Sequence, residues 1–194
     1  VKDAGKAGLD LDVKDMWVSG VGTVTGPVYS GPGLEDYYTL TWTPTTSIGQ
    51  GVKTVRVRAV DKAGNEATET WEFTVDSEPP TLALTSPALV TVGADKYITT
   101  LTPVVTVTAT DDGSGVKPAT GTFKIEISGG ADITADGTGA WSGTAYTWTL
   151  TAPNKLDEAN TYVVTMTNVE DNAGKKATES WTFKVDATAP TITI

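Results

Sequence analysis

Carboxylate side chains in turns and linkers are the best candidates for chemistry in this chain of 194 residues. The acidic residues concerned lie in three short segments: Asp76 and Glu78, Asp111 and Asp112, and Asp171. Flexible segments rich in carboxylate oxygens suit Ca²⁺, which takes about six to eight oxygen ligands at about 2.4 Å. These segments are far apart in sequence, so only the fold can bring them to one place.

The composition removes most other kinds of chemistry. The chain has no cysteine and no histidine, so it lacks thiol chemistry, the commonest general base and the commonest zinc ligand. It contains neither a Gly-x-Ser-x-Gly turn nor a phosphate-binding loop. We therefore expect that the protein is not an enzyme. Its net charge of −10 opposes nucleic-acid binding, and its apolar runs are too short for insertion into a membrane.

One passage of the sequence occurs twice. Residues 61–76, DKAGNEATETWEFTVD, return without a gap as residues 171–186, DNAGKKATESWTFKVD. Each copy is followed by a proline and a threonine-rich apolar run, at residues 80–84 and 190–194. The period of about 110 residues fits a whole β-sandwich domain and exceeds the repeats of solenoid proteins. The chain is therefore predicted to be a string of similar domains.

Alternating apolar residues predict the strands of these domains. In residues 103–110 the side chains of Val105, Val107 and Ala109 share one face, which is typical of a strand with one buried side. The fold class predicted is all-β, with tandem immunoglobulin-like sandwiches of about seven antiparallel strands each. Trp71 and Trp181 alternate in phase with a Phe and a Val, so both are predicted to lie in a core.

The repeat also predicts the domain boundaries. Residues 77–186 form a complete domain, whereas residues 1–76 contain nothing that corresponds to 81–110 and lack the first two strands. Residues 187–194 are predicted to be the first strand of a following domain. We interpret both ends as cut within domains; in the alternative, another copy supplies the missing strands by strand addition. Alignment of the two copies requires one extra residue near Val169, which predicts a β-bulge.

Immunoglobulin topology places the loop after the second strand and the loop before the last strand at the end where the chain enters the domain. The predicted ligands of an interdomain Ca²⁺ site are Asp76, Glu78, Asp111, Asp112 and Asp171. Asp3 and Asp61 occupy the equivalent loops of the first domain. An alternative stays open, because Asp-x-Ala-Gly-Asn is also a tight turn in which Asp caps its own backbone and Gly adopts a positive φ.

The repeated motif resembles a known family. Val-x-Ala-x-Asp-x-Ala-Gly-Asn, then a Trp-x-Phe-x-Val-Asp strand and Asp-x-x-x-Pro-Thr, is similar to the tandem bacterial Ig-like domains of large cell-surface proteins. The resemblance covers essentially the whole chain and implies an extracellular location, with calcium in some Asp-rich loops. The second copy departs from the motif, because Lys175 replaces its final Asn.

The resemblance implies a structural role at the cell surface, in an S-layer, an adhesin stalk or a surface fibre. The expected partners are other copies of the protein or neighbouring domains of a longer chain. The alternative is an accessory module beside a secreted glycan-active catalytic domain. A surface glycan would be recognised by exposed aromatic side chains, for which the candidates are Trp17, Tyr29, Tyr37 and Trp141.

Overall fold

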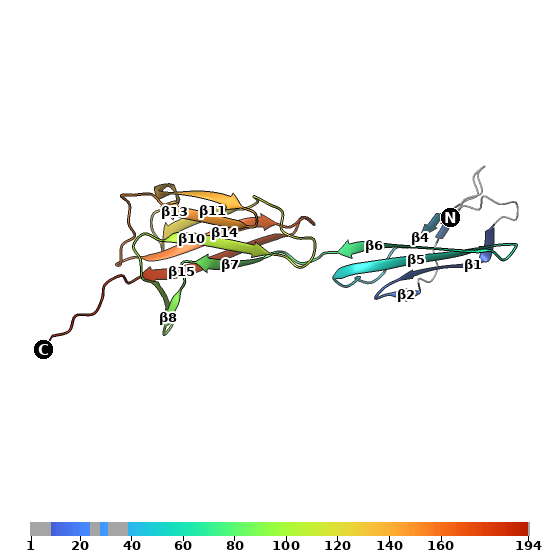
Figure 1. The fold of residues 1–194 in the computed structure, drawn as a ribbon, viewed down its shortest axis with the longest axis horizontal. Coiled ribbons are helices and arrows are strands. Elements are labelled where there is room, and N and C mark those ends of the chain that lie inside the picture. The colour runs from blue at the N-terminus through green and yellow to red at the C-terminus, as the bar shows by residue number, and fades with distance from the viewer. Residues whose placement is uncertain (1–8, 24–27, 31–38, 194) are drawn as a thin grey trace. The chain divides into compact units, whose positions relative to one another are not determined.

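The computed structural model of the protein describes residues 9–23, 28–30 and 39–193. The described chain consists of strands, turns and one short 3₁₀ helix, which confirms the all-β prediction (Figure 1). It divides into two compact units, residues 1–76 and 77–194. Within the part that the structure describes, no helix has the length and apolar character needed to cross a membrane.

The second unit is a sandwich of two sheets. One sheet has the strand order β12-β13-β10-β7, and the other has the order β11-β14-β15-β9-β8. The bounds are β7 Thr81–Ser86, β8 Val90–Val92, β9 Asp95–Ile98, β10 Val104–Thr110, β11 Thr122–Ile127, η1 Thr134–Asp136, β12 Gly137–Ser142, β13 Ala145–Leu150, β14 Thr161–Glu170 and β15 Lys176–Val185. Buried side chains of both sheets form one hydrophobic core between the layers.

The alternation of apolar residues explains how this core forms. The inward side chains of Val105, Val107 and Ala109 on β10 are at most 2% exposed, as predicted. The side chain of Trp148 on β13 is 1% exposed, and its indole nitrogen donates a hydrogen bond of 3.0 Å to the carbonyl of Thr134. Because successive strand residues face opposite sides, the threonines between the apolar residues of β10 point away from the core.

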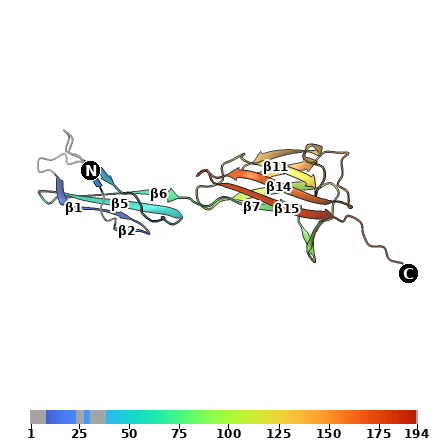
Figure 2. The same cartoon turned by 180° about the vertical axis from the view of Figure 1, so that it is seen from behind.

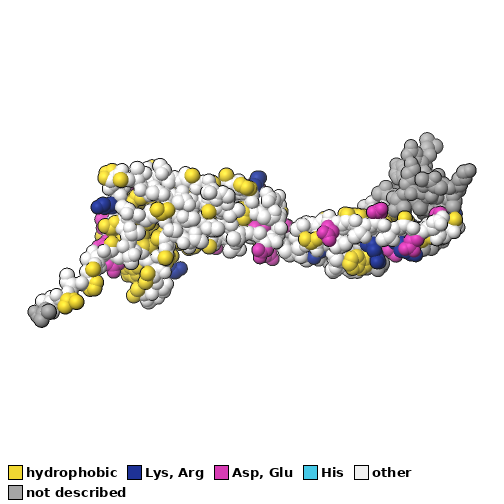
Figure 3. Space-filling model, in the orientation of Figure 1, with side chains coloured by type: hydrophobic (Ala, Val, Ile, Leu, Met, Phe, Trp, Pro, Cys, Tyr) yellow, Lys and Arg dark blue, Asp and Glu magenta, His cyan; other side chains and the backbone are white. Residues whose placement is uncertain are grey.

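The first segment of the second unit contributes to both sheets. Strand β7 pairs antiparallel with β10, whereas β9 pairs parallel with β15 through Tyr97 and Ile98. The chain therefore changes from one sheet to the other between β7 and β9, and β7 lies beside β15 (Figure 2). The β8–β9 hairpin protrudes from the sandwich, and the side chains of Val90 and Val92 are 51% and 61% exposed (Figure 3).

The extra residue predicted in the second copy is a bulge in β14. The β14–β15 register shifts between Met166 and Val169, and Asn168 adopts a φ of 57°. The corresponding ladder of the first unit, β5–β6, runs without a shift from Gly51 to Val60. The bulge lies just before Val169 and increases the local twist of the strand.

The first unit contains one four-stranded sheet, β2-β1-β5-β6, and a two-stranded ladder, β3-β4, among its described residues. The bounds are β1 Leu9–Val18, β2 Gly22–Thr23, β3 Val28–Ser30, β4 Thr39–Thr41, β5 Gly51–Asp61 and β6 Glu66–Val75. Its buried apolar cluster is small and centres on Val18 and Val55, with Trp42 packed against them.

The prediction that Trp71 is a core residue is wrong. Its side chain is 48% exposed, and that of Phe73 on the same strand is 38% exposed. Trp71 pairs with Val55, so both side chains stand on the core side of the sheet. Among the described strands, however, β6 is the last of its sheet. Trp181, the second copy's equivalent, is half-buried and packs against the core.

The residues after β15 form no strand within the described part, which ends at residue 193. The side chain of Ile192 is 90% exposed. The carboxylate of Glu158 accepts hydrogen bonds from the Ala187 amide at 2.6 Å and from the Thr188 hydroxyl at 3.0 Å, which anchors the start of this segment. The strand predicted at residues 190–194 stays a prediction, since it needs partners from another domain or another chain.

Candidate metal centre

Asp111 and Asp171 are brought together by two loops of the second unit. Asp111 directly follows β10 of one sheet, and Asp171 directly follows β14 of the other. The Asn172 side-chain amide donates to the carbonyls of Ser114 at 2.9 Å and Gly115 at 3.0 Å. The Asn172 backbone amide also donates to Gly115, at 3.0 Å. As a result, carboxylate oxygens of Asp111 and Asp171 lie within 4.8 Å of one another.

The carboxylate of Asp171 is buried and only partly hydrogen-bonded. The residue is 0% exposed, and its Oδ1 accepts a hydrogen bond of 2.8 Å from the Lys175 amide. Its Oδ2 is buried and has no hydrogen-bond partner. A buried carboxylate oxygen without a partner costs about 1–3 kcal/mol or more, so this oxygen is suited to a ligand that supplies positive charge.

The spacing of the two carboxylates fits a calcium ion. Two oxygens that bind one Ca²⁺ at about 2.4 Å lie no more than about 4.8 Å apart. The Oδ1 atom of half-buried Asp111 accepts hydrogen bonds from the amides of Gly113 at 3.2 Å and Gly115 at 2.6 Å, which fix its orientation. Oxygen donors favour hard cations such as Ca²⁺ over the metals that prefer nitrogen or sulfur.

The other predicted ligands are not part of this pair. Asp112 and Glu78 are exposed, and neither belongs to the group of carboxylates close enough to share an ion in the described chain. Asp76 is the last residue of the first unit, where its Oδ1 accepts a hydrogen bond of 3.0 Å from the Gln50 side-chain amide. Asp3 lies outside the described residues. Within the second unit, the structure thus brings two of the predicted ligands together.

Asp61 uses its carboxylate within its own turn. Its Oδ1 accepts hydrogen bonds of 2.8 Å from the backbone amides of Ala63 and Asn65, and its Oδ2 accepts one of 2.8 Å from the Asn65 side-chain amide. The Asn65 side chain, then its backbone amide, lower the pKa of Asp61 because they stabilise the ionised form. For this copy, the geometry supports the alternative of a tight turn without a metal.

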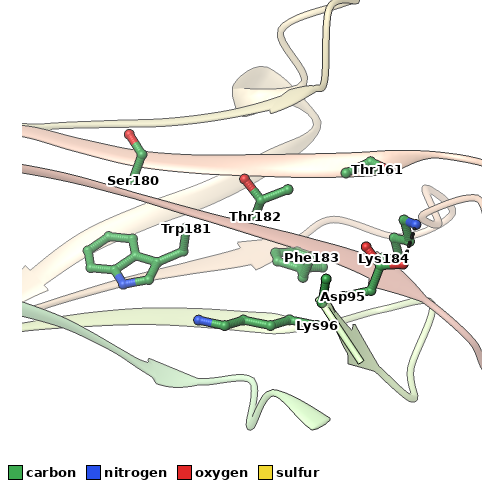
Figure 4. Close-up of a pocket in the computed structure, with 9 residues that line it drawn as sticks. Asp95, Lys96, Thr161, Ser180, Trp181, Thr182, Phe183 and Lys184 are labelled. Carbon is green, nitrogen blue, oxygen red and sulfur yellow. Dashed lines mark hydrogen bonds and ion pairs between the residues drawn. The ribbon is translucent and has the colours of Figure 1, made fainter. Parts of the chain in front are cut away.

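Sequence reasoning missed a hollow between β9 and β15 of the second unit (Figure 4). Ser180, Trp181 and Thr182 of β15 are among the residues that line it, together with Lys96 of the hairpin. An ion pair of 2.7 Å between Lys184 Nζ and Asp95 Oδ2 lies at one end, and this contact raises the pKa of Lys184. The hairpin and β15 are distant in sequence, so no local pattern indicates the hollow.

The aromatic residues proposed for glycan binding lie in separate places. Trp17 belongs to the first unit, where the Arg56 guanidinium carbon is 5.9 Å from its ring centre. Trp141 belongs to the second unit and contacts Tyr146 edge to face, with ring centres 5.5 Å apart. Tyr29 lies in β3, and Tyr37 lies outside the described residues. Glycan recognition stays a prediction.

Comparison with known proteins leaves the chain without a family assignment. No protein-family model matches the sequence, and no curated protein matches it.

Proposed function

We propose that this chain is a structural segment of an extracellular bacterial cell-surface protein built from tandem Ig-like domains, as in S-layers, adhesin stalks or surface fibres. The internal repeat supports this proposal, because in each unit the duplicated passage forms the turn and the second strand of an antiparallel pair of long strands. These pairs are β5–β6 in the first unit and β14–β15 in the second.

The observation that carries the proposal is the parallel pairing of β9 with β15. Strand β9 lies in the first segment of the second unit and β15 is its last strand, so this pair ties the two ends of the unit together. The Asp186 amide donates a hydrogen bond of 2.9 Å to the Ile98 carbonyl, and the ion pair of Lys184 with Asp95 adds a side-chain contact. A pull on the ends loads parallel strands in shear, so their hydrogen bonds must break together.

A calcium ion would add a second tie between the layers. Asp111 follows a strand of one sheet and Asp171 a strand of the other, so an ion held by both carboxylates would cross-link the sandwich. Such a tie stabilises the folded unit by an amount that grows with the logarithm of the free calcium concentration above the Kd. Extracellular Ca²⁺-binding modules commonly work at about 10⁻⁴–10⁻³ M calcium, which suits this role.

Single-molecule force spectroscopy on the whole chain tests the mechanical role. The extended second unit spans about 36 nm, because roughly 105 residues from Thr81 to Val185 extend at about 3.4 Å each, and its unfolding is recognised by a gain equal to this length less the folded end-to-end distance. The chain has no cysteine, so a Thr99→Cys variant with a C-terminal handle defines a second pulling direction. That direction peels β9 from β15 one bond at a time.

We expect a clearly higher unfolding force when the chain is pulled by its two ends than when it is pulled from position 99. The forced rate of unfolding depends on the barrier, so the comparison reports the shear geometry directly. Equal forces in the two directions, or a lower force for the ends, would contradict a mechanical role for the β9–β15 pair.

A further inference from the structure

The two copies of the repeated turn form a matched pair with the same backbone. The first residue's amide donates to the carbonyl of the fifth in both, at 2.9 Å for Asp61 to Asn65 and at 3.0 Å for Asp171 to Lys175. In both, the fifth residue's amide donates to the Asp Oδ1 at 2.8 Å. The glycines before the fifth residue have φ values of 89° and 84°. Differences between the carboxylates therefore arise from side chains.

The two Asp side chains differ in how many hydrogen bonds they accept. In the first copy, the Asn65 amide nitrogen lies 2.8 Å from Asp61 Oδ2. In the second copy, Lys175 cannot provide that amide, and Asp171 Oδ2 is buried without a partner. The backbone amide of Ala63 donates to Asp61 Oδ1. The equivalent amide of Ala173 donates instead to the hydroxyl of Ser114, at 3.0 Å. Asp171 has thus lost two of the hydrogen bonds that its counterpart accepts.

We infer that the fifth residue of the turn determines whether the turn binds a divalent cation. In the first copy the side-chain amide of Asn65 donates to Asp61 Oδ2, so this oxygen is not available to an ion. In the second copy exposed Lys175 makes no such bond, and Asp171 Oδ2 can bind the ion. This inference rests on the calcium site proposed above. An amide hydrogen and a cation compete for the same oxygen, so a single residue distinguishes a self-contained turn from a ligand turn.

The test is a Lys175→Asn variant of the whole chain, with Lys175→Ala as the matched control. Asn is the residue that the first copy carries in the same backbone, so this variant should retain the turn. Calorimetric titration with CaCl₂ measures the calcium affinity. Scanning calorimetry in a chelator measures the melting temperature of the second unit without bound calcium. We expect Lys175→Asn to weaken calcium binding about ten- to a hundredfold, the equivalent of one hydrogen bond to a charged group, while Lys175→Ala binds like the unaltered chain.

The chelator measurement provides a readout that does not require calcium. In the chelator, the Lys175→Asn variant should melt at a higher temperature than the Lys175→Ala variant. The reason is that the new Asn side-chain amide would donate a hydrogen bond to the buried Oδ2 of Asp171. Equal melting temperatures, or equal calcium affinities for the two variants, would overturn the role of the fifth residue and leave the calcium site intact. Failure of the unaltered chain to bind calcium would instead overturn the site and this inference together.

Discussion

Replacing Asp171 by Asn should stabilise the second unit without calcium and destabilise it with calcium. The substitution preserves size and keeps an oxygen for the Lys175 amide, which lies 2.8 Å from Oδ1. It removes a buried charge and exchanges the unpartnered oxygen for an N–H₂ group. A carboxylate oxygen of Asp111 lies within 4.8 Å of one of Asp171, so Asp111 can accept a hydrogen bond from the new group.

The size of each effect follows from the hydrogen-bond inventory. Leaving a buried polar atom without a partner costs about 1–3 kcal/mol, so we take about 2 kcal/mol as the gain in a chelator. A unit of this size changes its melting temperature by about 4 °C for each kcal/mol, which gives a rise of about 8 °C. Free calcium at a hundredfold excess over its Kd stabilises the unaltered unit by about 2.7 kcal/mol, so the variant should then melt about 3 °C lower.

Differential scanning calorimetry of the whole chain, in a chelator and in calcium, measures both values. The matched control is Asp61→Asn, which removes the same charge from a carboxylate whose oxygens are occupied by its own turn. The control should lower the stability of the first unit by the same amount in both solutions. If Asp171→Asn also lowered the melting temperature equally in both solutions, the carboxylate would be an ordinary turn cap and the reasoning would be refuted.

Two further predictions concern the pKa and the tryptophans. The pKa of Asp61 should lie below its ordinary value of 3.8, and Asn65→Ala should raise it in an NMR titration. Since the folded pKa is depressed, this carboxylate's contribution to stability is present above about pH 4 and is lost as the pH falls through the folded pKa. Trp148→Ala should cost about 3–5 kcal/mol in urea unfolding, because the side chain is 1% exposed and bonds the Thr134 carbonyl. Trp71→Ala, at a site 48% exposed, should cost less than about half of that.

The inward face of each strand was predictable from sequence, whereas the presence of a covering layer was not. Alternation identifies Val105 and Val107 as core residues because a shift of one position would turn every side chain to the other face. The same reasoning fails for Trp71, which has the phase of Trp181. A residue on the inward face of a strand is buried only where other parts of the chain cover that face of the sheet. Residues elsewhere in the sequence determine whether such a covering layer forms.

The candidate site was predictable as a location but not as a set of ligands. The repeat assigns Asp61 and Asp171 to equivalent turns, which suggests the same role for both. The structure distinguishes them through the fifth residue and through Ser114, which lies 59 positions before Ala173, the residue whose amide it accepts. The exchange of Asn65 for Lys175 was the one visible signal of this difference in the sequence.

The most direct test of the account is a calcium titration of the uniformly ¹³C-labelled whole chain, followed at the aspartate carboxyl carbons by NMR. The carboxyl signals of Asp111 and Asp171 should shift together and saturate with one bound ion, because their oxygens lie within 4.8 Å of one another. The carboxyl signal of Asp61 should stay in place, since Asn65 occupies its second oxygen. An unchanged Asp171 signal at millimolar calcium, or an equal shift at Asp61, would contradict the account.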